Sequence, residues 1–562
     1  MFIKIIKIFI FILLVFYQNL LYAENKDINE FNSKGLSNYF SAQVSYINQK
    51  NSNALKFFKN SKFLKNKHAP YFKYYIFSLV NEGNVSEAIK ELKEYSFKNS
   101  PDFFEAYFLL TIDSLKKNNF EKTKAYLKDL SKIKDKDTFQ LAIYESLKNF
   151  NYVFENKKIP TEKSNFGNLS LISHTFQNCY LDEKNTYSFF LNLINNIETD
   201  HSRYIFFLVN YLVKKNRIYE AEKITDKINT LNSSLLVSQT KKWVKEKKLK
   251  KFNEIFSCEN NLDILGEFFF LMANIYSSQN DYEKSNFYLN ISNYFNPKFK
   301  FNLTLMAENY FDNKNYKQSG KILDNFTKED DFFYWYKVRK KSEIIFEELG
   351  AEKSFNFINK KFKKIKNPSI KIIFDMASIT KGLKKYDIAV EYYNKILSKI
   401  DINNESYAKI LYRRGGSYER LGNFEQSDKD LLKSLELNSE DAYVLNYLAY
   451  SWLERDHKIN IAIQMLEKAY KLKKNDAFII DSIGWAYYLV GDFVKAEKLM
   501  KRALILMPDD PTVNDHYGDI LWKLNRIVQA QYYWKSVLRS KNAEKDMKDK
   551  INIKLLKGPK KI

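Results

Sequence analysis

Apolar and polar residues alternate along most of this chain with the 3.6-residue period of amphipathic helices, and short polar connections separate the helical segments. Residues 477–510 show the pattern most clearly. Gly484 lies midway through a first helical stripe, Gly491 interrupts the pattern, Phe493 opens a second stripe, and Pro508 ends it. This segment predicts one helical hairpin, and its length is typical of repeat proteins.

The same register recurs along the chain at nearly constant intervals. Small residues mark the first helix of each hairpin at positions spaced by 34, 35 and 34 residues, namely Gly415, Ala449, Gly484 and Gly518. A matching set marks the second helices at Ser427, Ala462, Ala496 and Ala530. Further upstream Ala273, Ala307 and Ala377 open similar units. Small side chains at both positions let the two helices approach closely while larger residues fill the remaining space.

This periodicity predicts an all-α fold, a right-handed α-solenoid of helical hairpins. The signal is strongest in residues 263–545, whereas residues 35–262 fit an irregular solenoid or a helical bundle. The expected divisions are a signal peptide at 1–23, N-terminal repeats at 24–160, irregular repeats at 161–262, regular repeats at 263–400, a C-terminal block at 401–545 and a basic tail at 546–562.

The first residues have the pattern of a secretory signal peptide. Two lysines precede an apolar run at 8–17, and Ala23 offers a small residue for cleavage before Glu24. The run is shorter than the roughly 20 residues that a transmembrane helix needs, although an uncleaved anchor stays open. No cysteine stands near the cleavage point for lipid attachment. We therefore expect an exported, periplasmic protein, soluble or peripheral to a membrane.

Two cysteines, Cys179 and Cys258, would enter this oxidising compartment. They are 79 residues apart, which corresponds to about two repeats of a regular stack. A disulfide needs Cα atoms within roughly 7 Å of each other. Only a fold-back of the irregular middle section would permit this, so the sequence favours two free thiols.

Composition and sequence motifs exclude several classes of function. The chain has 562 residues with only 14 glycines and 8 prolines, which favours several helical cores over a turn-rich β fold. The formal charge of +24 comes from lysines scattered along helices, without a nucleic-acid-binding motif, so nucleic acid is not an expected partner. GxSxG, HExxH, P-loop and GxGxxG signatures are absent from the sequence.

These observations predict a protein that is not an enzyme, without cofactor, metal or small-molecule substrate. The rival interpretation is a cell-wall enzyme with its site in residues 140–262.

Three strings in the last repeats carry a family resemblance: LNYLAYSWLERD, IDSIGW at 480–485 and HYGDILWKLNR. With them, residues 408–545 resemble the C-terminal tetratricopeptide block of exported proteobacterial repeat proteins, over about a quarter of the chain. Relatives of that type include a lipoprotein adaptor that brings peptidoglycan hydrolases to a protease. The resemblance implies protein binding in the cell envelope, although this chain lacks the lipid-attachment cysteine. The segment from Phe256 to Phe299 is similar to a repeat of marine α-proteobacterial proteins.

First helices of stacked tetratricopeptide hairpins line an inner groove, and the register predicts which residues face it. The candidates are Tyr412, Gly416, Glu419, Asn446, Tyr450, Asp481, Trp485, Tyr488, Asp515, Asp519 and Trp522. Aromatic residues beside three aspartates suit a protein or peptide ligand with basic or polar character. The alternative is that these side chains pack between hairpins. Trp534 occupies a large-residue position of a second helix and is expected in the core.

The function expected from the sequence is a scaffold or adaptor that binds protein partners in the envelope. The alternative is a structural subunit of an outer-membrane assembly, secretion or polysaccharide-export complex.

Overall fold

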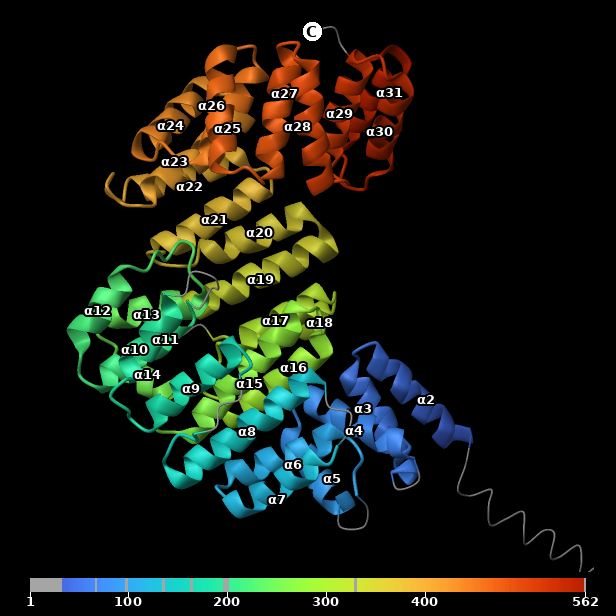
Figure 1. Cartoon of the computed structure of the whole chain (residues 1–562), viewed down its shortest axis with the longest axis vertical. Coiled ribbons are helices and arrows are strands. Elements are labelled where there is room, and N and C mark those ends of the chain that lie inside the picture. Colours follow the sequence, from blue (N-terminus) through green and yellow to red (C-terminus); the bar gives the residue numbers. More distant parts are fainter. Residues whose placement is uncertain are drawn as a thin grey trace, which may run out of the picture. The chain divides into compact units, whose positions relative to one another are not determined.

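The computed structural model describes residues 33–559 apart from 66–67, 97–99, 134–136, 162–164, 196–201 and 328–330, and every regular element of these residues is a helix (Figure 1). The all-α prediction is therefore confirmed. The predicted signal segment 1–23 lies outside the described residues. In the part of the chain that the structure covers, each helix is too short or too polar to cross a membrane.

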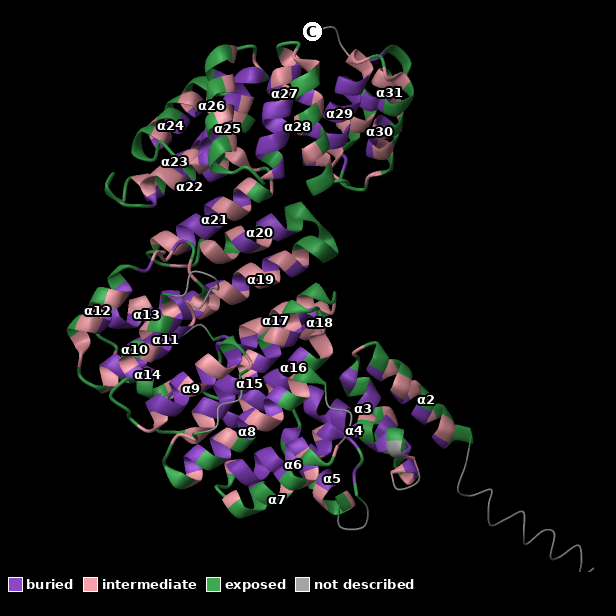
Figure 2. Cartoon of the chain, viewed as in Figure 1, coloured by how far each residue is buried: buried purple, intermediate pink, exposed green. Residues whose placement is uncertain are grey.

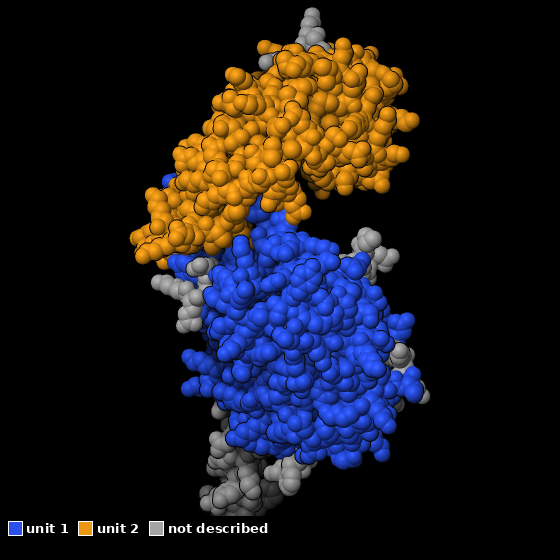
Figure 3. Space-filling view, turned by 90° about the vertical axis from the view of Figure 1, so that its left-hand side faces the viewer, with its two compact units in different colours: residues 1–354 blue, residues 355–562 orange. Residues whose placement is uncertain are grey.

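The chain divides into two compact units, residues 1–354 and residues 355–562, which we call unit 1 and unit 2 (Figure 3). The division falls inside the segment 263–400 that the sequence had grouped as one set of repeats.

Unit 1 holds the less regular helices. They are α2 (Ser33–Ile47), α3 (Asn51–Asn60), η1 (Lys62–Leu64), α4 (Ala69–Asn81), α5 (Val85–Ser96), α6 (Phe104–Lys116), α7 (Phe120–Ser131), α8 (Thr138–Asn156), α9 (Asn168–Tyr180), α10 (Thr186–Ile194), α11 (Tyr204–Lys214), α12 (Ile218–Asp226), α13 (Leu235–Lys245), α14 (Lys250–Ile255), α15 (Asn261–Ser278), α16 (Tyr282–Phe295), α17 (Asn302–Asp312), α18 (Tyr316–Leu323) and α19 (Asp331–Leu349).

Unit 2 begins within α20 and consists of regular hairpins followed by one further helix. Its helices are α20 (Ala351–Phe362), α21 (Ile370–Gly382), α22 (Tyr386–Leu397), α23 (Tyr407–Arg420), α24 (Phe424–Leu437), α25 (Ala442–Leu453), α26 (Ile459–Leu472), α27 (Ala477–Leu489), α28 (Phe493–Leu506), α29 (Pro511–Lys523), α30 (Ile527–Arg539) and α31 (Lys545–Lys557).

Local sequence explains where the helices of unit 2 end and begin. The turn inside each hairpin needs one residue with positive φ, which glycine adopts without steric cost; Gly422 (φ 74°) and Gly491 (φ 84°) fill this place. The next hairpin starts with an aspartate that accepts hydrogen bonds from its first free amides, as Asp476 does from the amides of Phe478 and Ile479. These signals fix the hairpin boundaries.

The small residues of the repeat lie where the two helices of a hairpin touch. A Cβ on Gly518 would overlap the indole of Trp534, and one on Gly484 would lie 3.2 Å from the end of Met500. Trp534 is fully buried, as the sequence predicted. Buried residues line the facing sides of paired helices in Figure 2. The small-to-large pairing therefore builds the core of each hairpin.

Within unit 1 the early helices pack against helices nearly 200 residues further along. Helices α4 and α5 contact α16. The ring centroids of Phe77 and Phe287 are 5.0 Å apart, and Lys116 Nζ donates a 2.6 Å hydrogen bond to Tyr294 O. The solenoid of unit 1 thus turns back on itself and buries the faces that the N-terminal repeats present.

The two cysteines form a disulfide, so the prediction of free thiols was wrong. Their Cα atoms are 5.6 Å apart although 79 residues separate them in the sequence. Cys179 lies at the end of α9 and Cys258 follows α14, and helices α10 to α14 return the chain between them. Phe176 and Phe256, three and two residues before the cysteines, pack in one aromatic cluster with a centroid distance of 5.9 Å. The fold-back required for a bridge is present.

The segment predicted as a basic tail is also different in the structure. Residues 545–557 form helix α31, and Ile551 is fully buried against the C-terminal block. This helix covers the end of the last hairpin, as a terminal capping helix does in repeat proteins. Its lysine-rich composition hid a stripe of apolar residues that includes Met547, Ile551 and Leu555.

Candidate protein-binding groove

Unit 2 contains a groove of about 510 Å³ that crosses successive repeats. Its lining comes from the first helices of four hairpins: Glu419 and Arg420 on α23; Asn446, Tyr447, Tyr450, Ser451 and the adjoining Glu454 on α25; Phe478, Asp481 and Ser482 on α27; and Thr512 on α29. First helices alternate with second helices along the chain, so stacking places their free faces in one row. Asn446, Tyr450 and Asp481 of the predicted set line this groove.

Two polar atoms of the lining lack partners. Asn446 Oδ1 and Ser451 Oγ are buried and have no hydrogen-bond partner among the described residues. Leaving such atoms unpaired costs free energy, and because both atoms are buried a ligand would reach them only after a movement of neighbouring side chains. Phe478, in contrast, is 62% exposed at the same groove. The groove therefore offers both hydrogen-bonding atoms and an apolar contact.

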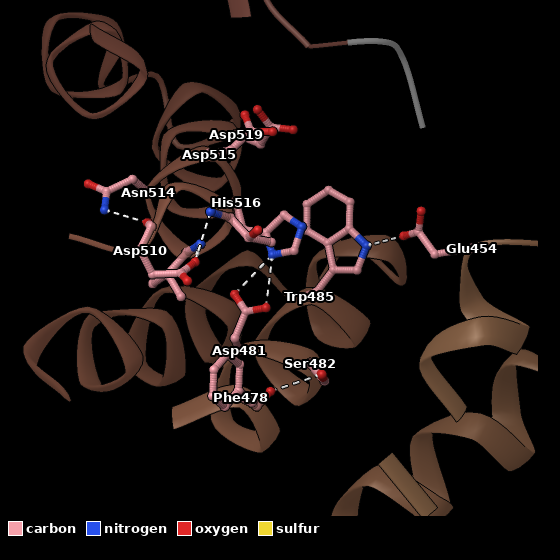
Figure 4. Close-up of polar contacts among 12 residues, drawn as sticks. Glu454, Phe478, Asp481, Ser482, Trp485, Asp510, Asn514, Asp515, His516 and Asp519 are labelled. Atoms are coloured by element: carbon pink, nitrogen blue, oxygen red, sulfur yellow. Dashed lines mark hydrogen bonds and ion pairs between the residues drawn. The ribbon is translucent and has the colours of Figure 1, made fainter. Parts of the chain in front are cut away.

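Trp485 lies beside the groove in a stack of rings. Its indole stacks on the His516 imidazole, with ring centroids 4.1 Å apart (Figure 4). It also stacks on the Tyr488 ring, with ring centroids 4.7 Å apart. Its Nε1 donates a 3.1 Å hydrogen bond to Glu454 Oε1. Trp485 is half-buried and its two faces are occupied, so only its edge remains for a ligand.

A buried ion pair supports this stack from below. His516 Nδ1 lies 2.9 Å from Asp481 Oδ1 and 3.2 Å from Oδ2, which joins α29 to α27 (Figure 4). Burial alone lowers the pKa of His516, but the charges of Asp481, Asp515 and Asp519 outweigh it and raise the pKa above the ordinary value. Asp481 is therefore neutralised within the protein.

The other two aspartates of the predicted groove are also paired internally. Lys554 Nζ on α31 donates to Asp515 Oδ1 at 2.6 Å and to Asp519 Oδ2 at 2.8 Å. Asp519 Oδ1 also accepts a 3.2 Å hydrogen bond from Trp534 Nε1, and burial raises the pKa of Asp519 to about 6. The three aspartates are thus paired within the unit, so the charge on which the expectation of a basic ligand depends is already balanced by His516 and Lys554.

Tyr488, Asp519 and Trp522 do not present the open surface that the register predicted. Tyr488 and Asp519 are buried, at 2% and 3% exposure. Trp522 packs against Trp534, and Gly558 at the end of α31 lies so close that a Cβ there would overlap the indole. Helix α31 covers this end of the groove, and the sequence interpretation did not include that helix.

Glu419 of the predicted set lines the other end of the groove, whereas Tyr412 lies outside the lining. Tyr412 is half-buried and packs edge-on against Tyr447, with centroids 5.7 Å apart. Glu419 Oε2 accepts a 3.0 Å hydrogen bond from the Tyr447 hydroxyl, and it lies 3.4 Å from Arg420 Nε. Tyr412 therefore serves mainly to pack α23 against α25, while Glu419 is shared between two neighbours.

Sequence reasoning missed the basic residues of α23. Lys409, Arg413, Gly416 and Arg420 follow each other at intervals of four, three and four residues, which places them on one stripe of the helix. Attention to this spacing would have found them. Tyr412 and Gly416 had been chosen as groove residues, whereas the cations beside them had been treated as part of a generally solvated surface.

The comparisons with known proteins agree with the repeat architecture. The tetratricopeptide repeat family matches residues 408–441, the hairpin of α23 and α24. The "TPR repeat-containing protein PA4667" of Pseudomonas aeruginosa is 33% identical over 110 residues, 20% of this chain and 18% of that protein. The "Peptidyl-prolyl cis-trans isomerase CYP7" of Saccharomyces cerevisiae is 28% identical over 139 residues, 24% of this chain and 33% of that protein.

Among solved structures, a tetratricopeptide repeat protein from Parabacteroides merdae aligns with a TM-score of 0.38 and 15% identity, over 45% of this chain and 98% of that one. The chain spans only a fifth to a third of the length of the two relatives above. The family match at residues 408–441, together with the helical hairpins described above, shows tetratricopeptide repeats in this chain.

Proposed function

We propose that this protein is a non-enzymatic tetratricopeptide scaffold that holds an extended segment of a partner protein in the groove of unit 2. One observation carries the proposal: side chains from four successive first helices line a single groove of about 510 Å³. A groove that crosses repeats takes a ligand along its length, as extended peptides and helices bind. The yeast relative named as an isomerase matches over only a third of its own length, so its activity is no guide here.

The chemistry of the lining suits a polypeptide. Asn446 and Ser451 bring a side-chain amide and a hydroxyl to the lining, the kinds of group that hydrogen-bond to a polypeptide. Phe478 supplies an exposed aromatic ring at the edge, the kind of residue that dominates binding energy in interfaces.

The proposed location is the periplasm, where the scaffold recruits or organises envelope proteins. The basic and apolar N-terminal pattern supports export. The Cys179–Cys258 disulfide supports it independently, because disulfides persist in oxidising compartments and are rare in the cytosol. N-terminal sequencing of the exported product tests cleavage after Ala23; an intact Met1 would make the protein membrane-tethered.

Two exposed aromatic residues provide a matched test of the groove. Phe478 on α27 and Tyr532 on α30 are both 62% exposed, but only Phe478 lines the groove. Peptides selected from a displayed library against the full chain should bind Phe478→Ala about tenfold more weakly than wild type, as expected for loss of an interface anchor. Tyr532→Ala should bind like wild type. Equal effects of the two substitutions would place the binding site elsewhere.

A further inference from the structure

We propose that the outer face of helix α31 docks on a membrane surface that contains anionic phospholipids. Ile553 and Leu556 enter the headgroup region, and the lysines beside them contact lipid phosphates. The lining of the groove comes from α23 to α29, so this surface is separate from it and the proposal goes beyond the proposed function. Its basis is an exposed apolar pair and the charges around that pair.

Helix α31 carries apolar side chains on two faces, and the last hairpin covers one of them. On the inner face Ile551 is fully buried, and Met547 and Leu555 pack against the same core. On the outer face Ile553 is 59% exposed and Leu556 is 83% exposed. Residues three apart adjoin on the surface of a helix, so these two side chains form one patch.

An exposed apolar pair is unusual at this place in a repeat protein. Terminal helices cover the end of a solenoid and carry a polar outer face, which keeps that end soluble. Helix α31 meets the first requirement, since Ile551 is buried and Gly558 lies against the Trp522 indole. It does not meet the second requirement, which indicates that its outer face has a partner surface of its own.

Lysines lie next to the apolar pair. Lys550 is three residues before Ile553 and Lys557 is four residues after it, so both side chains adjoin Ile553 on the helix surface. Both lysines are exposed. An apolar patch with lysines beside it is typical of helices that lie in the membrane interface, because the apolar side chains enter the lipid while the ammonium groups stay among the phosphates.

The acids of α31 lie in its first half. Asp546 and Asp549 precede residues 550–557, and this second half contains three lysines and no acid. One of these lysines, Lys554, faces the hairpin and pairs with aspartates of α29. The other two remain on the side of the apolar pair. The charge of the second half therefore suits an anionic surface.

The charge of the whole chain favours a membrane over a second copy of the protein. The formal net charge is +24, so two copies repel each other at long range, whereas an anionic leaflet attracts the chain. Contact between two copies through this face would also bring the lysine-rich halves of their helices together. With 13 residues, α31 is shorter than a membrane span, so it lies along the surface.

The experiment places an environment-sensitive fluorophore on this face. Asn552 is exposed beside Ile553, and the native cysteines are bridged, so Asn552→Cys provides a thiol that nitrobenzoxadiazole labels selectively. The labelled full chain is titrated with vesicles of phosphatidylglycerol and phosphatidylethanolamine, or of phosphatidylcholine alone. We expect stronger, blue-shifted emission with the anionic vesicles and no change with the neutral ones. Because the probe reports residue 552, attachment of the N-terminal segment to a vesicle does not by itself produce this signal.

A pair of matched substitutions in the labelled protein tests the apolar contact. Leu556→Ser should weaken binding to anionic vesicles about tenfold, because one leucine side chain no longer leaves water. Ile505→Ser is the control: Ile505 on α28 is 79% exposed and lies away from α31 in the sequence. It should bind like wild type. Both residues are on the surface, so thermal unfolding of the two variants should be unchanged.

A second pair tests the charges. Lys550→Gln combined with Lys557→Gln should weaken binding about tenfold, because each lysine near an anionic surface contributes attraction. Lys471→Gln combined with Lys474→Gln removes the same charge at the end of α26, where both lysines are exposed. That control should have a clearly smaller effect. Added salt should weaken the binding of wild type.

Three outcomes would overturn the proposal: unchanged emission with anionic vesicles, an equal change with neutral vesicles, or equal effects of Leu556→Ser and Ile505→Ser. Emission that rises with protein concentration in the absence of vesicles would show that a second copy covers the face, and would overturn it as well. Each of these results leaves the groove untouched, because peptide binding that depends on Phe478 is measured without vesicles.

Discussion

Unit 1 and unit 2 are built from the same kind of helical hairpin, but they use the inner faces of those hairpins differently. In unit 1 the N-terminal repeats pack on α15 and α16, with Phe108 against Phe269 at a centroid distance of 5.6 Å. In unit 2 the first helices leave a groove of about 510 Å³. A solenoid face that packs against its own chain is not free for a partner, and this difference is why we propose that the partner binds to unit 2.

The polar networks of the two units also differ, in the sequence distance that they bridge. In unit 1 Arg203 donates 2.7 Å hydrogen bonds to both carboxylate oxygens of the buried Glu267 and a further one to Asn302, which joins helices far apart in the sequence. In unit 2 His516 pairs with Asp481, and Lys554 pairs with Asp515 and Asp519, across 35 to 39 residues of sequence between successive repeats. Satisfied networks of this kind stabilise and specify a fold.

The largest expected effect comes from the core of unit 2. Trp534 is fully buried, and Trp534→Ala should lower the free energy of unfolding of this unit by about 3–5 kcal/mol through lost burial and a cavity. Hydrogen exchange should show the loss in α27 to α31 and leave α4 to α16 unchanged. Trp485→Ala is the control, because that ring is only half-buried and should cost clearly less. Equal losses would make Trp485 a core residue.

A smaller effect, confined to unit 1, is expected from the disulfide. Replacing both Cys179 and Cys258 by Ala frees a loop closed over 79 residues and should cost roughly 2–4 kcal/mol, because the unfolded chain regains conformational freedom. Exchange should increase in α9 to α14, and unit 2 should be unaffected. A parallel loss of protection in α23 to α30 would show that the units do not behave as separate bodies and would break the comparison.

The repeat register was predictable because it depends on contacts between neighbours in sequence. Gly484, Gly518 and Trp534 have the burial and contacts that the spacing implied, since a small residue and its large partner lie within one hairpin. Contacts between distant segments were not predictable in this way. The disulfide needs the return of five helices, and the cover over Trp522 comes from α31, whose apolar stripe is masked by seven charged residues in thirteen.

The sequence also did not show that the aspartates of the predicted groove are paired within the protein, for a related reason. Asp481, Asp515 and Asp519 stand on one face of first helices, so the sequence shows three acids toward a ligand. Their partners are His516 and Lys554. Each partner lies two helices further along the chain, at sequence distances of 35 to 39 residues from the aspartates. Three-dimensional packing decides which charges remain unpaired. The spacing of residues along the sequence does not show that packing.

The smallest expected effect is a dependence of the free energy of unfolding on pH. It sharpens the comparison of the two units, because His516 belongs to unit 2. The pKa of His516 is raised in the folded state, chiefly by Asp481, so the folded protein holds a proton that the unfolded chain releases near pH 6.5. Its stabilising contribution is fully present below that pH and is lost as the pH rises through the folded pKa. Asp519, with a pKa raised to about 6, acts in the same direction at lower pH, between about 4 and 6.

Measurement between about pH 6.5 and pH 8 therefore isolates His516 from Asp519. The free energy of unfolding of unit 2 should fall across this interval in wild type, and the fall should be smaller in His516→Gln. Subtracting the pH profile of His516→Gln from that of wild type removes the contribution of titrating groups that both proteins contain, such as Lys381. Nuclear magnetic resonance titration of His516 provides the direct check, with a pKa above 6.5 expected. A value below 6.5 would mean that burial outweighs Asp481, and stability would then rise with pH over the interval in which His516 loses its proton.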